Sequence, residues 1–208
     1  MNLLVTAGPT REYLDAVRYL SNASSGRMGY EVAREGVRRG HRVVLVTGPV
    51  ALRVPVGARV VRVTSAVEMR DAVLAEAAEA DALVMAAAVA DFRPRRRLPG
   101  KIKKSGRRTL EVDFVRNPDI LTEVCRRSRP RVVVGFALEE ERVAEEARRK
   151  LRAKRLDMIV ANTPAAMGAA AAAFRLLGEG FEREVRASKR RLARLILDFV
   201  EKRLGGTS

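Results

Sequence analysis

Short apolar runs alternate with amphipathic stretches along the chain, which predicts strands and helices in turn. The runs are apolar at nearly every position, a pattern typical of strands buried on both faces of a parallel sheet. We expect strands at residues 3–7, 42–47, 59–64, 82–87, 132–136 and 158–161. Helical periodicity indicates helices at residues 28–39, 66–78, 140–154 and 189–204. The sequence therefore predicts an α/β protein whose parallel sheet is covered by helices on both faces.

Two segments do not follow this alternation of strands and helices. Residues 91–117 are basic, contain Pro and Gly, and are too many for an ordinary strand-to-helix loop, so we expect a functional arm at about 92–116. Residues 172–186 predict a hairpin around Gly178 and Gly180. The length of 208 residues suits one α/β domain, and we expect a single domain over residues 1–208.

Composition narrows the possible partners. The chain has 41 Lys and Arg against 25 Asp and Glu, which gives a formal net charge of +16 and favours anionic ligands. Aromatic residues are only 4% and Trp is absent, which disfavours nucleic-acid binding by base stacking, although a purely electrostatic contact stays open. The one cysteine, Cys125, excludes an intrachain disulfide, and no apolar run is long enough for a membrane span. We expect a cytoplasmic protein without membrane contact.

The first candidate site is the segment SNASSGRMG, which stands at the head of the first predicted helix. Ser24, Ser25, Gly26 and Gly29 can build a helix N-terminus with free backbone N–H groups, which is a natural seat for phosphate. A capped helix packed tightly on a strand explains the same residues equally well. The spacing is not the dinucleotide fingerprint G-x-G-x-x-G directly after a strand.

Two further motifs suggest an anion site. Asp91, in AAAVADF, follows a predicted strand at its carboxyl end, where open α/β sheets bind ligands, although a loop-capping role fits as well. The chain holds 34 Arg but only 7 Lys, and three of those lysines cluster in GKIKK, at Lys101, Lys103 and Lys104. A mobile ammonium can follow a triphosphate as a point charge, whereas a charge run is more often a solvated face.

Taken together, these segments resemble the phosphopantothenoylcysteine synthetase family. The resemblance runs through TAGPTRE, SNASSGRMGYEVA, VTGP, AAAVADFRP, GKIKK, VRNPDIL, VGFALE and RRKLRAKRLDMIVAN. It implies a Rossmann-like, mostly parallel sheet flanked by helices, with a long dimerisation and active-site arm after the fourth strand. It also implies a homodimer that ligates 4′-phosphopantothenate to cysteine through an acyl-cytidylate made from CTP with Mg²⁺. CTP is favoured over ATP because GKIKK and NPDIL are prokaryote-like.

The resemblance implies roles for particular residues. Asn22 and Lys101 are the expected catalytic residues, and Arg18 and Asn22 the expected substrate-binding residues. The expected nucleotide-binding positions are Gly8, Ser24, Gly26, Gly29, Met85, Ala86, Ala87, Asp91, Lys101, Pro118, Asp119, Ile120, Leu121, Phe136, Lys150 and Lys154. Metal ligands are not indicated.

Alternatives of other classes follow from the residues alone. An NAD(P)-dependent Rossmann oxidoreductase has only fold-level analogy and the glycine-containing helix start in its favour, and a basic nucleic-acid-binding protein only the net charge. The resemblance adds a separate flavin-dependent phosphopantothenoylcysteine decarboxylase as a conceivable partner, and it implies no nucleic-acid partner.

Overall fold

The computed structural model describes residues 1–103, 108–164 and 169–206. Its centre is an eight-stranded sheet in the order β12-β11-β10-β9-β6-β1-β4-β5. Six neighbouring strands, from β10 to β5, run parallel, and β11 and β12 add an antiparallel hairpin at one edge. The strands are β1 Asn2–Ala7, β4 Arg42–Thr47, β5 Arg59–Arg62, β6 Ala82–Met85, β9 Val132–Leu138, β10 Met158–Asn162, β11 Ala171–Gly178 and β12 Phe181–Ser188.

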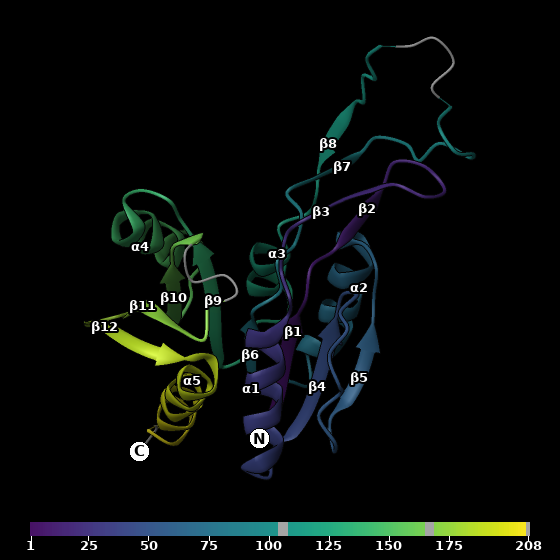
Figure 1. Cartoon of the computed structure of the whole chain (residues 1–208). Coiled ribbons are helices and arrows are strands. Elements are labelled where there is room, and N and C mark those ends of the chain that lie inside the picture. The colour runs from purple at the N-terminus through teal and green to yellow at the C-terminus, as the bar shows by residue number, and fades with distance from the viewer. Residues whose placement is uncertain (104–107, 165–168, 207–208) are drawn as a thin grey trace.

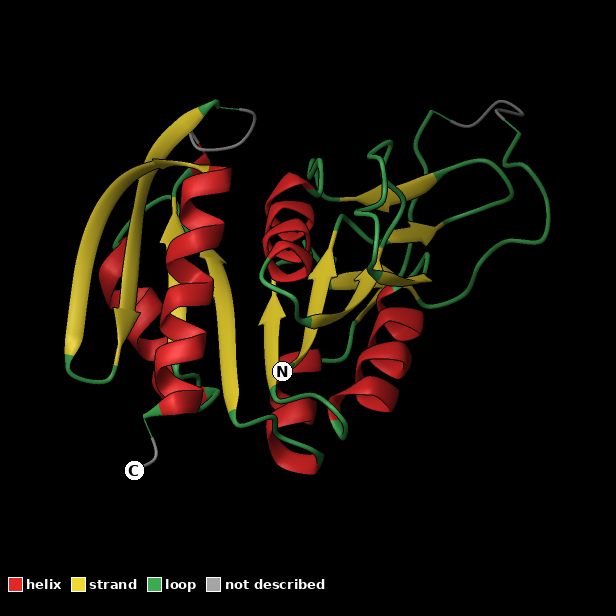
Figure 2. Cartoon of the chain, turned by 90° about the horizontal axis from the view of Figure 1, so that it is seen from below, coloured by secondary structure: helices red, strands yellow, loops and turns green. Residues whose placement is uncertain are grey.

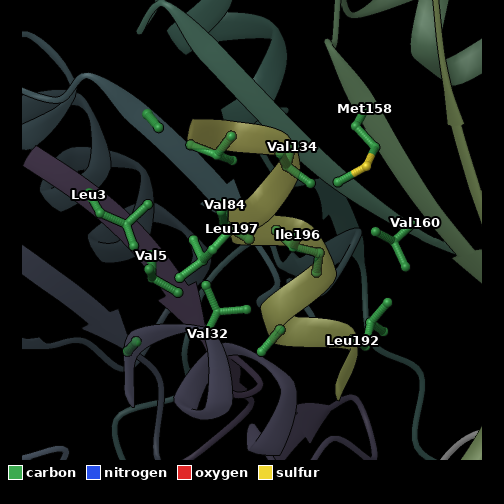
Figure 3. Packing of buried hydrophobic residues seen from close by; sticks show 14 of the residues in the cluster. Leu3, Val5, Val32, Val84, Val134, Met158, Val160, Leu192, Ile196 and Leu197 are labelled. Atoms are coloured by element: carbon green, nitrogen blue, oxygen red, sulfur yellow. The ribbon is translucent and has the colours of Figure 1, made fainter. Parts of the chain in front are cut away.

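Five helices cover the sheet on both faces (Figure 2). They are α1 Arg27–Arg38, α2 Ala66–Ala77, α3 Ile120–Arg127, α4 Val143–Ala153 and α5 Lys189–Gly205. Helices α1 and α5 pack on one face, where Val5, Val32 and Ile196 belong to one buried cluster (Figure 3). Helices α2, α3 and α4 pack on the other face around Leu4 and Met69. Successive strand residues thus enter opposite cores, as the apolar runs predicted.

The parallel strands appear in the sheet in the chain order 3-2-1-4-5-6, which is the Rossmann arrangement. The predicted α/β class, the six parallel strands and the hairpin around Gly178 and Gly180 are confirmed. Within the described parts of the chain, none of the helices combines the length and apolarity that a bilayer crossing requires.

Two small antiparallel pairs, which the sequence did not predict, project beyond the carboxyl edge of the sheet (Figure 1). Strands β2 Arg11–Tyr13 and β3 Tyr19–Ser21 form a hairpin inserted between β1 and α1. Strands β7 Phe92–Pro94 and β8 Phe114–Arg116 pair at the base of a long excursion. The expected arm at 92–116 therefore leaves and returns at one place, because Phe92 pairs with Arg116.

Several predicted boundaries move, by one to three residues, and β5 ends at Arg62 rather than residue 64. Strand β6 ends at Met85 rather than residue 87, because the Ala87 amide donates to Thr6 Oγ1 (3.1 Å) instead of joining the ladder. Strand β9 continues to Leu138, and α4 begins at Val143 rather than residue 140. The Glu139 amide still donates to the Asn162 carbonyl (3.0 Å), which keeps this segment extended beside β10.

Candidate active site

The candidate site lies where β1 and β6 end side by side. Chain connections leave these two neighbouring strands in opposite directions along the sheet, and ligands of open α/β sheets bind at the carboxyl edge of such a switch point. Beyond the ladder the strand ends are held together by the Ala88 amide, which donates to the Gly8 carbonyl (2.9 Å). This edge brings together Gly8, Ala86 and Ala87, three of the expected nucleotide-binding positions.

Glycines let the head of α1 approach the end of β1 at backbone distance. Gly8 and Gly26 both have positive φ, 76° and 75°, and a Cβ on Gly26 would lie 3.2 Å from the Gly8 Cα. A Cβ on Gly29 would lie 2.5 Å from the Thr6 carbonyl oxygen. The sequence-adjacent pattern of a dinucleotide fingerprint is absent, because the β2–β3 hairpin separates Gly8 from Gly26, yet the fold reunites them.

The N-terminus of α1 has no side-chain cap. Gly26 is the N-cap residue and provides no side chain to cap the helix, while Ser24 Oγ accepts from the Gly26 amide (3.3 Å). The first amides of the helix therefore face the carboxyl edge of the sheet without an intrahelical partner. Such a terminus binds phosphate through its N–H groups and helix dipole. The phosphate seat at Ser24, Gly26 and Gly29 stays a prediction, and the tight packing of Gly29 on β1 agrees with the alternative reading of a helix packed on a strand.

Asn22 lies against the loop that follows β6. Its Nδ2 donates to the carbonyls of Ala88 (3.2 Å) and Val89 (3.0 Å), which occupies both N–H groups. Two carbonyl acceptors fix which end of the amide faces the loop, so Oδ1 is the end left for a ligand. Donation from Nδ2 to a substrate oxygen would require exchange of one of these bonds.

Three expected nucleotide-binding side chains belong to the core instead. Met85 is 6% exposed and accepts a hydrogen bond at Sδ from the Thr6 hydroxyl (3.2 Å). Ile120 and Leu121 belong to the first turn of α3, and their side chains are buried in the hydrophobic cluster that this helix shares with α2 and α4. A contact of these residues with a nucleotide is therefore limited to their backbone, since apolar packing determines where the side chains point.

The base of the arm lies beside this edge. The Asn117 amide donates to the Asp91 carbonyl, and Asn117 Nδ2 donates to the Ala90 carbonyl, both at 2.8 Å. Arg93 in turn donates to Asn117 Oδ1 (3.0 Å). Asp91 itself is exposed at the carboxyl edge. The expected positions Pro118 and Asp119, which follow Asn117, are thus held next to Asp91.

Lys150 in α4 and Lys154 at its C-cap are already paired with carboxylates. Lys154 Nζ contacts Asp119, the N-cap residue of α3, at 2.8 Å, and Lys150 Nζ contacts Glu139 at 2.5 Å. Burial raises the pKa of Asp119, but the hydrogen bonds from Lys154 and Thr122, together with the charge of Lys154, outweigh it, and the pKa is lowered. Phe136 is half-buried on the opposite, α1–α5 face. These expected positions therefore surround β9 without forming one cluster.

Arg18 and Lys101 lie away from the helix terminus, where the tip of the β2–β3 hairpin meets the arm. Arg18 Nη1 donates to the carbonyl of Ile102 (3.2 Å), the residue after Lys101. Lys101 is exposed, Lys103 is exposed nearby, and Lys104 falls outside the described residues. The described contacts of one chain thus bring Arg18 close to the lysine segment but do not bring Lys101 to α1.

Buried polar residues are the part of the site that sequence reasoning missed. Thr10 Oγ1 accepts from the Ala90 amide (3.0 Å), and Glu12 Oε1 accepts from the Ala66 amide (2.8 Å) at the head of α2. Asp15 is fully buried, and the hydrogen bond from the Ile102 amide, with those of Val17 and Arg18, holds the pKa of its carboxyl well below its usual range. The available signal was polar residues at fixed positions inside TAGPTREYLD.

A parallel sheet in the order 3-2-1-4-5-6, with a glycine-built helix terminus at its switch point, defines the class of Rossmann-like α/β proteins. Within that class the chain matches the family model described as DNA/pantothenate metabolism flavoprotein C-terminal domain over residues 1–204. The chain belongs to this family.

Relatives and solved structures agree with this assignment. The coenzyme A biosynthesis bifunctional protein CoaBC of Bacillus subtilis is 45% identical over 170 residues, which are 81% of this chain and 41% of that protein. The crystal structure of the C-terminal domain of a CoaBC superposes with a TM-score of 0.83 at 35% identity, over 98% of this chain and 95% of that one. A Cab2 protein in complex with phosphopantothenate-cysteine shares the fold, with a TM-score of 0.81 at 16% identity, over 99% and 88%.

The chain spans about 41% of the length of the curated relatives that it matches.

Proposed function

We propose that the chain is a phosphopantothenate–cysteine ligase of coenzyme A biosynthesis, acting in the cytoplasm. The observation that carries the proposal is the match to the synthetase module of CoaBC along almost the whole chain, together with the phosphate seat at α1 beside Asn22. The relative solved with phosphopantothenate-cysteine supports the same product class. The decarboxylase that would consume the product is a flavin-dependent partner, either separate or linked to this domain.

The ligation proceeds in two displacements. The carboxylate of 4′-phosphopantothenate attacks the α-phosphorus of CTP, and pyrophosphate leaves with the electrons of the broken P–O bond. The cysteine amine then attacks the acyl carbon of the acyl-cytidylate, loses a proton and expels CMP. Nucleotide phosphates bind at the N–H groups of α1, beside Ser24 and Gly26. Asn22, held on the carbonyls of Ala88 and Val89, orients the acyl group.

A Mg²⁺ ion bound to the triphosphate would supply charge neutralisation on the phosphate oxygens. Within the described residues, no three His, Cys, Asp or Glu side chains gather as ligands. This donor set fits a cation held mostly by phosphate oxygens and water, with Asp91 as the exposed carboxylate at this edge.

The arm and hairpin support a homodimer. Seven of the nine large apolar side chains that are exposed among the described residues lie on them: Val17, Tyr19, Leu20, Phe92, Leu98, Leu110 and Phe114. Such a concentration is typical of a protein–protein contact surface. An arm that docks on a second copy would also bring Lys101 to the site of the partner, since its own α1 is out of reach.

The activity is tested by incubating the protein with 4′-phosphopantothenate, cysteine, Mg²⁺ and either CTP or ATP, and measuring pyrophosphate. We expect release with CTP and formation of the amide only when cysteine is present. Absence of pyrophosphate above background with both nucleotides would refute the ligase.

Asn22→Asp tests the site within this reaction. A carboxylate oxygen in place of Nδ2 would face two carbonyl oxygens, so the side chain turns away and turnover falls while the fold survives. Mass spectrometry of the quenched reaction would then find less amide per acyl-cytidylate formed. Asn2→Asp, the same change at the opposite edge of the sheet, is the control, and equal rates for the two variants would exclude the role of Asn22.

A further inference from the structure

Asp15 is a fully buried carboxylate in a hairpin whose neighbouring residues are exposed. Val17 and Tyr19, close by in the chain, are 56% and 42% exposed, whereas the Asp15 side chain is 0% exposed. A buried charge is costly unless hydrogen bonds compensate it. Asp15 accepts four, so its surroundings are built around the charged form.

The two oxygens of Asp15 serve different parts of the molecule. Oδ1 accepts from the amides of Val17 (2.7 Å) and Arg18 (2.8 Å), which closes the turn of the hairpin itself. Oδ2 accepts from Arg18 Nη1 (2.5 Å) and from the amide of Ile102 (3.0 Å), which lies in the arm. One oxygen therefore shapes the hairpin, and the other joins it to the arm.

The arm is fastened to the hairpin around this oxygen. Arg18 Nη1 also donates to the Ile102 carbonyl (3.2 Å), so both backbone groups of Ile102 are held. The Leu98 amide donates to the Leu14 carbonyl (2.9 Å). Arg97 adds a cation–π contact over Tyr13, 4.8 Å from the ring centroid. The segment that carries Lys101 thus lies along the hairpin tip, with Asp15 Oδ2 at the junction.

We propose that Asp15 is a positioning residue of the ligase. Its Oδ2 holds the arm against the hairpin, and this contact places Lys101 and Arg18 side by side, where both bind the anionic groups of the substrates. The inference rests on the proposed function. Lys101 is exposed, and no carboxylate pairs with it among the described residues, so its backbone attachment is what fixes its place. A fixed ammonium acts on phosphate charge without first losing the entropy of a free loop.

Asp15→Asn separates this role from a merely structural one. Asparagine keeps an acceptor for the amides of Val17 and Arg18 at Oδ1, but its NH₂ group cannot accept from Ile102 or Arg18 Nη1. We expect pyrophosphate release to fall about 10- to 100-fold, because the two hydrogen bonds that Asp15 Oδ2 accepts are lost. The effect should fall on kcat, while kcat/KM for cysteine stays unchanged because the amine reacts with the acyl-cytidylate after pyrophosphate has left.

Two further variants locate the effect. Ile102→Pro removes the amide donor from the arm side and leaves the Asp15–Arg18 pair, so it should lower kcat in the same way. If both act through one hydrogen bond, the double variant is no slower than the slower single one. Asp113→Asn, in an exposed arm ion pair with Arg95, is the control and should keep the wild-type rate.

Tryptic cleavage after Lys101 in the intact protein gives a readout independent of activity, and we expect it to be about tenfold faster in Asp15→Asn than in Asp113→Asn. A wild-type rate for Asp15→Asn overturns the proposal. So does a wild-type rate for Ile102→Pro, because Asp15 would then act through Arg18 alone, and so do additive losses in the double variant. If the unaltered protein releases no pyrophosphate, the ligase function fails, and unchanged cleavage in Asp15→Asn still refutes the proposal that Asp15 holds the arm.

Discussion

Replacing Gly29 by alanine should force α1 away from the end of β1. The new methyl would lie 2.5 Å from the Thr6 carbonyl oxygen and 2.6 Å from the Ala7 Cβ. Ordinary contact begins at about 3.5 Å, so the helix must retreat by about 1 Å. Backbone atoms of a central strand cannot yield in its place.

Gly36→Ala is the matched control in the same helix. Its methyl would lie 2.7 Å from Leu3 Cδ2 and 3.0 Å from Val43 Cγ2, which are the ends of side chains that can turn. Both changes gain similar helix propensity, about 1 kcal/mol, so this gain cancels in the comparison. Overpacking against rigid atoms costs about 1–3 kcal/mol, and we expect Gly29→Ala to be the less stable variant by about 2 kcal/mol.

Thermal unfolding and nucleotide titration test this prediction together. For a chain of this size the difference corresponds to a Tm lower by about 4–8 °C for Gly29→Ala than for Gly36→Ala. The α1 amides move with the helix, so CTP affinity in calorimetry should fall at least about tenfold for Gly29→Ala only. Equal stability and equal affinity of the two variants would refute the reasoning that close packing at Gly29 sets the phosphate seat.

Other predictions concern the surface, the arm and the acid limb of stability. Hydrogen bonds from Arg38, with those from Arg39, hold the pKa of Glu35 at about 2. The contribution of Glu35 to the free energy of unfolding is therefore complete above pH 4.5 and is lost as the pH falls towards 2. In acid denaturation, the free energy of unfolding of Glu35→Gln should fall less steeply over this pH range than that of the unaltered protein. Asn117→Ala removes the side-chain hydrogen bonds of Asn117 with Arg93 and Ala90 at the base of the arm. Scanning calorimetry should show a free energy of unfolding lower by about 2 kcal/mol. Phe114→Ser should shift light-scattering mass towards the monomer, whereas Val56→Ser, elsewhere on the surface, should leave it unchanged; the reverse would contradict an arm-mediated dimer.

The sheet could be predicted because its information is local. Each parallel strand carries its own apolar run, and the bounds of β4 at Arg42–Thr47 agree with the predicted strand. The short pairs could not be predicted, since β2 and β7 have three residues each and their register comes from partners elsewhere in the chain.

The candidate site was predictable as a set of motifs but not as a geometry. The glycines of SNASSGRMG gave the helix terminus, and Asn22 does lie at the strand edge. The side chain of Met85 points into the core because of the face of the sheet on which its position in β6 falls. The pairing of Lys154 with Asp119 depends on how α3 and α4 pack against each other. The contact of Asp15 with Ile102 spans 87 positions along the chain, so neither segment alone contains a signal for it.

The two outer strands determine how copies of this protein can associate. On β12 the charged residues Glu182, Arg183 and Glu184 follow one another, and β5 begins and ends with Arg59 and Arg62. An incoming strand would have to bring its backbone alongside these charges and lose their solvation. Sheet extension between copies is thereby disfavoured at both edges. In the proposed homodimer the contact therefore falls on surfaces outside the sheet, such as the exposed arm, and not on strands paired from one copy to the next.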